Sequence, residues 1–198
     1  MAIYFARHGQ TENGSEDRLE GSSDSPLTAK GREQAQALAQ YIQNLNVARI
    51  IASPLGRAQE TARIVDDRIG CGVMIREEWR EMSYGEWDGQ RKKDLKLHPQ
   101  WGEREKNKFF FVHPGSREGR NGESYQMLFE RLRQPLLDLE VNFPQENILI
   151  ICHNGVLRAV KKFFLQLTPA QTIEFSPSNS TLLKIEKAAA ITVETIDY

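Results

Sequence analysis

The sequence predicts an α/β protein with three layers: a mostly parallel central sheet with an antiparallel edge, and helices on both of its faces. Short apolar runs alternate with amphipathic stretches of helical period, which is typical of β-α-β units. The run 147–152 is continuously apolar, as in a central strand that is covered on both faces. The segments 171–176, 181–186 and 191–197 alternate polar and apolar residues, which predicts edge or antiparallel strands.

The first part of the chain contains two predicted strand–helix pairs. Residues 2–6 form a short apolar strand, and an amphipathic helix over 28–45 follows with Thr28 as its N-cap. A buried strand over 47–52 precedes a second helix, whose apolar positions are Ala58, Ala62, Val65 and Ile69. The repetition of strand and helix is what a parallel sheet requires.

The later part of the chain continues this alternation. Residues 73–75 form a short strand, and a long helix starts near Gly122. Pro135 is expected to kink or restart that helix, because proline lacks the backbone N–H. The strand 147–152 is followed by a last helix, whose apolar positions are Val156, Val160, Phe163 and Leu167.

The composition is that of one ordinary folded domain over residues 1–198. Of the 198 residues, 39% are hydrophobic and 27% are charged, which is enough for a sizeable core. The formal net charge of −1 points neither to nucleic acid nor to a membrane surface as a partner. Cys71 and Cys152 make no disulfide framework and lack metal-ligand spacing, so we expect no metal and no cofactor.

The first residues predict no secretory signal. Arg7 and His8 interrupt the apolar run that a signal peptide needs. No apolar stretch approaches the length of a membrane-spanning helix. The reducing cytoplasm is therefore the expected compartment.

Charged and imidazole side chains follow the predicted strands. Arg7, His8 and Gly9 come directly after the first strand, and His153 follows the strand 147–152. Arg57 lies shortly after the strand 47–52. Because ligands of open α/β sheets bind at the carboxyl ends of the strands, these residues are candidates for an anion-binding site.

A carboxylate completes the candidate set. Glu81 lies just beyond the short strand at 73–75, in the segment Arg-Glu-Met-Ser-Tyr-Gly-Glu-Trp-Asp-Gly. Two histidines, two arginines and one glutamate thus come from separate segments. This combination suits phosphoryl transfer through histidine.

The same segments carry a family resemblance. The chain resembles the histidine phosphatase, or phosphoglycerate-mutase-like, superfamily, and its small phosphatase members in particular. The matching blocks occur in the family's order and are RHGQTE (7–12), SDSPLTAKGREQA (23–35), SPLGRAQETA (53–62), REMSYGEWDG (80–89), GES (122–124) and CHNGVLR (152–158). The resemblance implies that His8 is the nucleophile and that the fold is phosphoglycerate-mutase-like.

The residue types account for such chemistry. A phosphate monoester carries nearly two negative charges near neutral pH and repels anionic nucleophiles, whereas a neutral His8 imidazole can attack phosphorus. Arg7 and Arg57 are expected to hold the equatorial oxygens, and a protonated His153 adds a third positive group. These cations stabilise the transferring phosphoryl group without a metal. The expected intermediate is a phosphohistidine that water later hydrolyses.

Glu81 is the candidate proton donor to the leaving oxygen. A general acid must be protonated near its working pH, so the site is expected to raise the pKa of Glu81. The same carboxylate can then accept a proton from the attacking water. Glu77, Glu78 and Glu86 are neighbouring rivals for this role.

Further substrate-binding residues are implied by the resemblance, with three departures from the family pattern, one of which is Gln10 at a position where glutamate is frequent. The loop residues Gln10, Thr11 and Asn13 are expected near the phosphoryl group, although Asn13 stands one place early and Gly14 occupies the matched position. Asn154 replaces the glycine that usually follows the second histidine. An amide at that place is also found in members that act on fructose 2,6-bisphosphate, which points toward sugar phosphates.

Residues 90–121 are the least regular part of the chain and are predicted to be a flap-like insertion. They hold nine Lys or Arg residues against four acidic ones, together with Trp101 and the Phe109–Phe111 run. One interpretation is a solvated helix whose aromatic side chains pack on the body of the protein. The other is a basic flap over the site that attracts a phosphorylated substrate and shapes the pocket of its leaving group.

Three functions remain open on the sequence alone. The first is a metal-independent phosphomonoesterase that acts on a small phosphorylated metabolite such as a sugar phosphate. The second is a phosphoglycerate mutase, which would hold its phosphohistidine against water. The third is a non-catalytic protein that binds phosphorylated ligands. The C-terminal strands leave open a homo-oligomer paired along the sheet edge.

Overall fold

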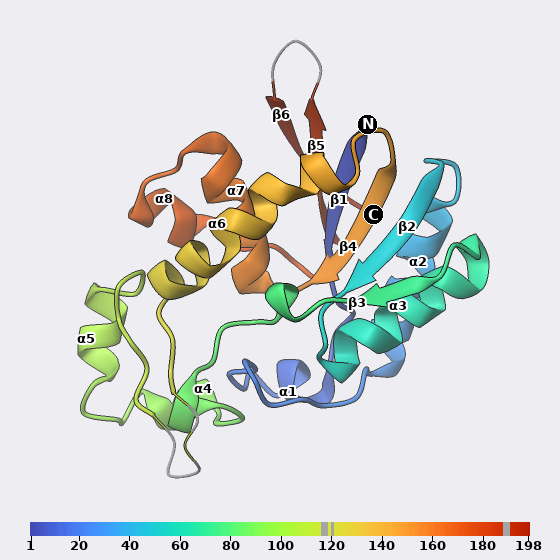
Figure 1. Ribbon diagram of the computed structural model, residues 1–198. Coiled ribbons are helices and arrows are strands. Elements are labelled where there is room, and N and C mark those ends of the chain that lie inside the picture. The colour runs from blue at the N-terminus through green and yellow to red at the C-terminus, as the bar shows by residue number, and fades with distance from the viewer. Residues whose placement is uncertain (116–118, 120, 188–190) are drawn as a thin grey trace.

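The protein is built on a six-stranded mixed sheet with strand order β3-β2-β4-β1-β5-β6 (Figure 1). The computed structural model describes residues 1–115, 119, 121–187 and 191–198. Its strands are β1 (Ala2–Arg7), β2 (Val47–Ala52), β3 (Val73–Ile75), β4 (Asn147–Cys152), β5 (Thr181–Lys187) and β6 (Ile191–Asp197). β1 and β2 pair with β4 in parallel and β3 pairs with β2 in parallel, whereas β5 is antiparallel to β1 and β6. The predicted fold class is confirmed.

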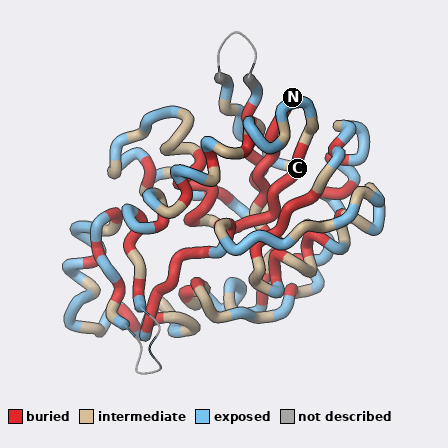
Figure 2. Tube along the Cα trace, viewed as in Figure 1, coloured by how far each residue is buried: buried red, intermediate tan, exposed pale blue. Residues whose placement is uncertain are grey.

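Two separate apolar cores lie on the two faces of the sheet. In β1, Ile3 and Phe5 belong to the core under α6 (Tyr125–Asn142) and α7 (Asn154–Leu165). Their neighbours Ala2, Tyr4 and Ala6 belong to the core under α2 (Ala29–Ile42) and α3 (Gly56–Ile69). This alternation follows from the two-residue period of a strand. The buried central strands run between the two helical layers in Figure 2.

The predicted helix starts agree with the structure. The Thr28 hydroxyl accepts a hydrogen bond from the Gly31 N–H and caps α2. Ser124 caps α6 in the same way through the Met127 N–H. α7 ends at Leu165 because Gln166 adopts a left-handed conformation with φ of 51°. Leu167, which was predicted to belong to this helix, therefore lies outside it. No helix in the described part of the chain is long and apolar enough to cross a membrane.

One expectation about the later part of the chain is wrong. Residues 171–176 do not form a strand, because α8 (Pro169–Glu174) occupies most of this segment. A capping box between Thr168 and Gln171, with proline at the first helical position, starts that helix and overrides the alternating pattern. α6 also runs through Pro135 without restarting. Its apolar face is held in the core on both sides of the proline, by Leu128, Leu132, Leu136 and Leu139.

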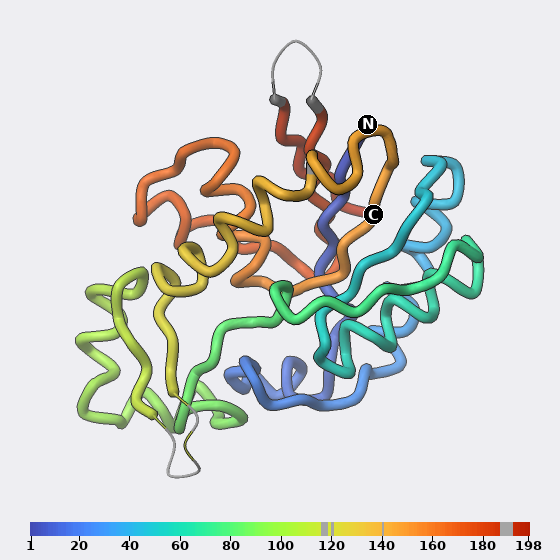
Figure 3. Tube along the Cα trace, in the orientation of Figure 1, coloured from blue at the N-terminus to red at the C-terminus, as the bar shows by residue number. Residues whose placement is uncertain are grey.

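The insertion leaves the sheet after β3 and returns through α6 (Figure 3). It contains α4 (Lys92–Leu95) and α5 (Trp101–Lys106), and residues 116–118 and 120 of the predicted flap lie outside the described residues. The remaining short helices of the described chain are α1 (Glu12–Ser15), η1 (Glu77–Trp79) and η2 (Gly85–Trp87).

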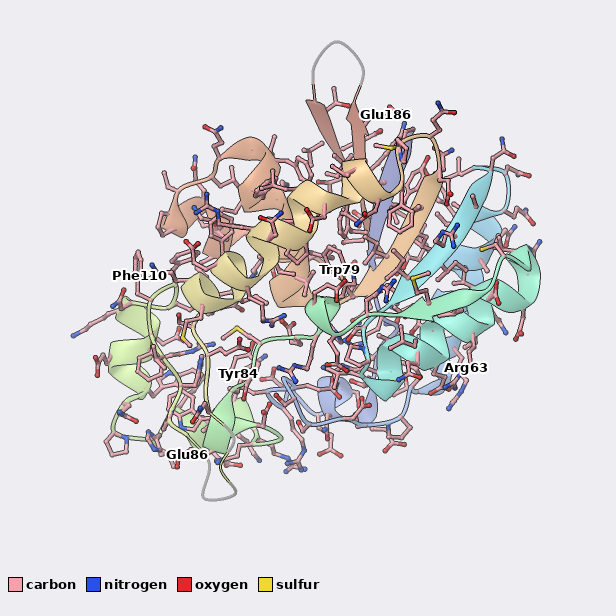
Figure 4. The ribbon with its side chains drawn as sticks, viewed as in Figure 1. Arg63, Trp79, Tyr84, Glu86, Phe110 and Glu186 are labelled. Atoms are coloured by element: carbon pink, nitrogen blue, oxygen red, sulfur yellow. The ribbon has the colours of Figure 1, made fainter. Side chains whose placement is uncertain are left out.

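The aromatic side chains of the insertion pack mainly on the body of the protein. Trp87 is fully buried and stacks on Trp101 and Phe111, with ring centroids 6.0 and 5.6 Å apart. Phe110 is 46% exposed and lies at the outer side of this segment, whereas Trp79 lies buried between α6 and the sheet (Figure 4). The packing interpretation is therefore confirmed for these aromatic groups.

Candidate active site

The parallel pairing of β1 and β4 brings the two histidines together. Arg7 stands opposite Cys152 in the register, so the residues that follow each strand leave the sheet side by side. The His8 N–H donates to the Cys152 carbonyl oxygen at 3.0 Å. The rings of His8 and His153 have centroids 5.1 Å apart. Strand pairing therefore places both imidazoles at the carboxyl edge of the sheet.

Hydrogen bonds determine the tautomer of His8. Its Nδ1 lies 2.8 Å from the Gly9 carbonyl oxygen, which can only accept, so Nδ1 carries the proton. Nε2 accepts a 3.2 Å hydrogen bond from Arg57 Nε and therefore presents a lone pair. Burial, together with Arg57 and Arg7, holds the pKa of His8 well below its ordinary value. The buried ring is thus a neutral imidazole with a basic Nε2.

A close backbone crossing holds the loop that carries His8. Gly9 lies against the backbone of Gly31 near the start of α2, and a Cβ added at Gly9 would overlap the Gly31 carbonyl oxygen. The Gly9 N–H donates to Thr61 Oγ1 at 3.1 Å, and Asn179 Nδ2 donates to the His8 carbonyl oxygen at 2.7 Å. Glycine is required at this position because only its hydrogen fits the gap.

His153 is buried and neutral rather than protonated. Its Nε2 lies 2.7 Å from Ser53 Oγ, and that oxygen also accepts the Leu55 N–H at 3.3 Å. Because a hydroxyl oxygen can accept two hydrogen bonds and donate one, the Ser53 hydroxyl is a suitable partner for either tautomer of His153. Nδ1 is buried and has no hydrogen-bond partner among the described residues. Burial, Arg57 and His8 hold the pKa of His153 well below its ordinary value, which corrects the expectation of a positive ring.

Arg57 is the most heavily bonded side chain of the site. It is 1% exposed and lies in the first turn of α3, after β2. Nη1 donates to the Ser23 carbonyl oxygen and to Asp24 Oδ1, and Nη2 donates to the Gly21 and Glu20 carbonyl oxygens. The planar fork is thus turned toward the loop 20–24, and the Nε–H is the donor that points at His8.

Arg7 ends β1 and faces the same site. Its Nη1 donates to the Pro177 carbonyl oxygen at 3.0 Å, while its Nε is buried without a partner among the described residues. Burial lowers its pKa, and Glu81 partly restores it. Arg7 therefore keeps a donor available for an anion near His8.

Glu81 is buried and held by two backbone groups. Its Oε1 accepts the Met82 N–H and its Oε2 accepts the Gly155 N–H, each at 2.9 Å. A Cβ added at Gly155 would overlap Glu81 Oε1, so the close approach requires glycine. Burial raises the pKa of Glu81 above its ordinary value, although the two hydrogen bonds oppose this shift. The raised pKa agrees with the expectation that Glu81 is protonated when it acts as a general acid.

A cavity of about 260 Å³ opens over His8. It is lined by Arg7, His8, Gly14, Arg18, Leu19, Glu20, Glu81, Tyr84, Lys92, Arg104, Lys108, Tyr125, Asn154, Arg158 and Ser176. Tyr84 lies on the segment that joins η1 to the insertion (Figure 4). The cavity therefore lies between the carboxyl edge of the sheet and the insertion.

The predicted substrate-binding residues divide into two groups. Asn154 lines the cavity, and its buried Oδ1 has no partner among the described residues. Gln10, Thr11 and Asn13 are absent from the described cavity wall. Gln10 Oε1 accepts from the Thr28 hydroxyl, and the Thr11 hydroxyl donates to Glu20. These loop residues hold neighbouring segments in place, whereas Gly14 of the same loop reaches the cavity.

Several residues of the cavity wall were not predicted. Arg158 ends the last matching block, and its role could have been suspected from its position one turn after His153. Lys92 and Arg104 belong to the nine cations of the insertion, whose composition does not indicate which of them face inward. Lys108, which also lines the cavity, was among the flap cations expected to attract the substrate. Glu20, Tyr84 and Tyr125 had no signal in a single sequence.

Comparison with known proteins agrees with this geometry. A relative from Enterobacter sp. (strain 638), named probable phosphoglycerate mutase GpmB, is 35% identical over 158 residues, which cover 79% of this chain and 70% of the relative. A relative of the same name from Cronobacter sakazakii is 35% identical over 172 residues, or 84% and 76% of the two chains.

Solved structures give the same result for the fold. A putative alpha-ribazole-5'-P phosphatase from Escherichia coli superposes with a TM-score of 0.88 at 25% identity, covering 100% of this chain and 96% of the other. A mycobacterial glucosyl-3-phosphoglycerate phosphatase superposes with a TM-score of 0.85 at 22% identity, covering 100% and 98%. The sequence pattern of the histidine phosphatase superfamily (branch 1) matches residues 3–190. The chain belongs to the histidine phosphatase superfamily.

Proposed function

We propose that the protein is a phosphomonoesterase that transfers the phosphoryl group of a small metabolite to His8 and then to water. In the first step a bond forms between His8 Nε2 and phosphorus while the ester P–O bond breaks, and Glu81 gives its proton to the leaving oxygen. In the second step water attacks phosphorus, the N–P bond breaks, and the Glu81 carboxylate takes a proton from the water.

One observation carries the proposal: the tautomer of His8 beside a buried carboxyl. The Nδ1–H bond to the Gly9 carbonyl oxygen leaves Nε2 unprotonated, and His8 lines a cavity that Glu81 also lines. A nucleophile and a proton donor thus share one pocket, with burial favouring the protonation state that each role needs.

Donors around His8 support the charge that develops on the phosphoryl oxygens. Arg7 Nε and His153 Nδ1 are buried nitrogen atoms without hydrogen-bond partners among the described residues, and Arg57 Nε donates to His8 Nε2. Preorganised donors of this kind stabilise a transferring phosphoryl group. His153 would act here as a neutral donor.

A phosphoglycerate mutase is the second candidate. The relatives that are 35% identical carry the name probable phosphoglycerate mutase. Both reactions use the same phosphohistidine, and they differ in whether water or a second substrate hydroxyl receives the phosphoryl group.

The first test is hydrolysis of p-nitrophenyl phosphate with EDTA present. We expect phosphate release by the parent protein and a loss of at least about 10³-fold in His8→Ala, because a catalytic nucleophile is removed. His98→Ala is the matched control, since His98 lies outside the described wall of the cavity and should keep its activity.

Absence of release from the parent protein would contradict the phosphatase proposal. Incubation with labelled 2,3-bisphosphoglycerate would then separate the remaining functions. Acid-labile label on the parent but not on His8→Ala would support the mutase, and no label on either protein would contradict both enzymatic functions.

A further inference from the structure

The carboxyl end of β2 adds a third buried side chain to the row of strand ends that holds the two histidines. The sheet order places β2, β4 and β1 side by side, and β4 is parallel to both of its neighbours. Ser53 follows β2, and its N–H donates to the Ile151 carbonyl oxygen of β4 at 3.0 Å. Ser53 is 0% exposed. Ser53, His153 and His8 therefore lie in this order along the carboxyl edge of the sheet.

The Ser53 hydroxyl has one acceptor for its hydrogen. Its Oγ lies 2.7 Å from His153 Nε2 and accepts the Leu55 N–H at 3.3 Å. Among the described residues Oγ has no further hydrogen-bond partner. If Oγ accepted from Nε2 as well, the hydroxyl hydrogen would be buried without an acceptor. Donation from Ser53 to Nε2 is the arrangement that leaves no hydrogen at this contact unpaired.

Donation to Nε2 leaves the hydrogen of the His153 ring on Nδ1. Burial and the positive charge of Arg57 hold the pKa of His153 well below its ordinary value, so the neutral ring carries one hydrogen. Nδ1 is buried and has no partner in the described part of the chain. A buried donor without an acceptor raises the free energy of the folded protein, and a bound acceptor relieves this cost.

The tautomer decides how His153 acts on a phosphoryl group at His8. The two rings have centroids 5.1 Å apart, so a phosphoryl group on His8 lies close to the second ring. Nε2 of His153 is turned to Ser53, and Nδ1 is the nitrogen left for that group. Phosphoryl oxygens accept hydrogen bonds, so an Nδ1–H stabilises their charge whereas an Nδ1 lone pair repels it.

We propose that Ser53 is a positioning residue, which keeps the hydrogen of His153 on Nδ1 so that the ring donates to the phosphoryl group during transfer at His8. The inference rests on the proposed function and adds to it a residue that acts through another, because His153 lies between Ser53 and His8 along the sheet edge. Ser53 donates to Nε2, Nδ1 donates to a phosphoryl oxygen, and neither hydrogen changes its atom during the step.

NMR measures the tautomer of His153 directly, without reference to activity. Long-range hydrogen–nitrogen correlation spectra of protein labelled at its four histidines distinguish a ring nitrogen that carries hydrogen from one that does not. His153→Gln identifies the signals of this ring. We expect the parent protein at neutral pH to carry the hydrogen on Nδ1. Ser53→Ala should lose this single tautomer, and Ser53→Thr, which keeps the hydroxyl, should retain it.

Kinetics test whether the tautomer matters for phosphoryl transfer. Ser53→Ala should lower kcat on p-nitrophenyl phosphate by about 10-fold to 10²-fold, less than the loss of about 10²–10³-fold that follows removal of a charge-stabilising donor. In a His153→Gln background, Ser53→Ala should cause no further loss, because the ring through which Ser53 acts is absent. A merely structural effect of Ser53 would persist in that background.

Thr172→Val is the matched control for the loss of a buried hydroxyl. Thr172 is 1% exposed, and its hydroxyl donates to the Thr168 carbonyl oxygen at 2.8 Å in α8. It lies outside the described wall of the cavity. The variant should lower the free energy of unfolding and should leave both kcat and the tautomer of His153 unchanged.

Three results would overturn the inference. They are a parent protein with the hydrogen of His153 on Nε2, a Ser53→Ala variant that keeps the parent tautomer, and a loss of kcat in Ser53→Ala that is undiminished in the His153→Gln background. The parent spectrum decides the first point even if Ser53→Ala folds poorly.

Failure of the proposed function is distinguishable from failure of this inference. If no ester is hydrolysed, the proposed function fails and inorganic phosphate serves as the probe in the same spectra. An Nδ1–H signal of His153 that phosphate shifts in the parent protein but not in Ser53→Ala would support the role of Ser53. A signal that phosphate leaves unchanged in the parent protein would overturn it.

Discussion

At the scale of single residues, burial shifts the pKa values of His8 and Glu81 in opposite directions. A low-dielectric environment disfavours the charged form of any group, so the pKa of the imidazole falls and that of the carboxyl rises. The positive charges of Arg7 and Arg57 lower both pKa values, and for Glu81 the effect of burial is the larger one. One pocket therefore favours a neutral nucleophile and a protonated acid at the same pH.

Glu81→Gln tests the role of the carboxyl as proton donor. The variant should lower kcat on an alkyl phosphate by about 10²–10⁴-fold, because an alkoxide leaves poorly without a proton. The variant should lower the rate of the first step on p-nitrophenyl phosphate far less, because p-nitrophenolate leaves without a proton from the enzyme. Burst kinetics on both substrates measure the difference, with Glu86→Gln as the control in an exposed neighbour. Equal losses on the two substrates would exclude proton donation by Glu81.

The pH dependence of the rate follows from the same two shifts. Activity should rise with pH as His8 loses its proton, below the ordinary histidine range, and should fall as Glu81 ionises, above the ordinary glutamate range. Glu81→Gln should remove the second, falling limb on alkyl phosphates. The optimum should therefore lie between the rising limb of His8 and the falling limb of Glu81.

At the scale of elements, the start of α3 depends on a residue from another loop. The N-cap residue Leu55 offers no side-chain acceptor. Asp24 takes this place, because its carboxylate accepts from the Gly56 N–H, from the Arg57 N–H at 3.3 Å and from Arg57 Nη1 at 3.1 Å. One carboxylate therefore caps a helix and orients a cation of the site.

Asp24→Ala should lower both stability and activity. Loss of the cap should reduce the free energy of unfolding by about 1 kcal/mol, and the loosened Arg57 should reduce kcat/KM as well. Asp24→Asn should keep most of the stability, since the amide oxygen still accepts, while weakening the bond to Arg57. Urea denaturation and steady-state kinetics measure the two effects.

Asp67→Ala is the control for this prediction, because Asp67 is exposed and lies near the other end of α3. Unchanged stability in Asp24→Ala would show that Asp24 does not cap the helix. Unchanged kcat/KM would show that capping of α3 by Asp24 is not needed to orient Arg57 for the reaction.

The short strands and helices show where sequence periodicity predicts secondary structure and where it does not. The strands 47–52, 73–75 and 147–152 are found where periodicity predicts them, because each has one clear pattern with defined ends. Residues 171–176 alternate like a strand, yet local capping by Thr168 and Gln171 makes most of them helical. Two local signals conflicted there, and hydrogen bonds of the first helical turn outweighed side-chain alternation.

At the scale of the whole molecule, three buried histidines couple stability to pH. Burial lowers the pKa values of His8, His153 and His113, the last to about 4. In the unfolded chain these groups bind protons below about pH 6.5. The unfolded state then holds more protons than the folded state, so the free energy of unfolding must fall as pH falls below that value. Glu81 has the opposite effect on the free energy of unfolding, because its pKa is raised and the folded state therefore keeps one proton that the unfolded chain loses.

Urea denaturation between pH 7 and pH 5 should therefore show stability falling with acid. Each histidine that stays neutral when folded contributes up to about 1.4 kcal/mol per pH unit. His113→Gln should reduce this slope by about one proton, because His113 is buried in the folded protein. A slope that His113→Gln does not alter would mean that His113 is protonated in the folded protein.

The sequence by itself determined the layered fold and the five candidate residues of the proposed reaction centre. The apolar runs dictate the strands, and His8, His153, Arg57 and Glu81 follow strands whose parallel pairing brings their ends together. Arg7 ends the first of these strands. The strands and the residues that follow them are local features of the chain, so the pattern of neighbouring residues predicts them. The roles assigned to these residues came from the family resemblance.

Only the tertiary structure decided the protonation of His153, the direction of the Arg57 fork and the cations that enter the cavity. Each depends on burial or on contacts between segments far apart in sequence, such as Arg57 with the loop 20–24. The insertion has no periodicity that would separate Lys108 from Lys106, yet one faces the cavity and the other is exposed. The composition of the insertion shows that it is rich in Lys and Arg, but only the folded path of the chain determines which of these side chains line the cavity.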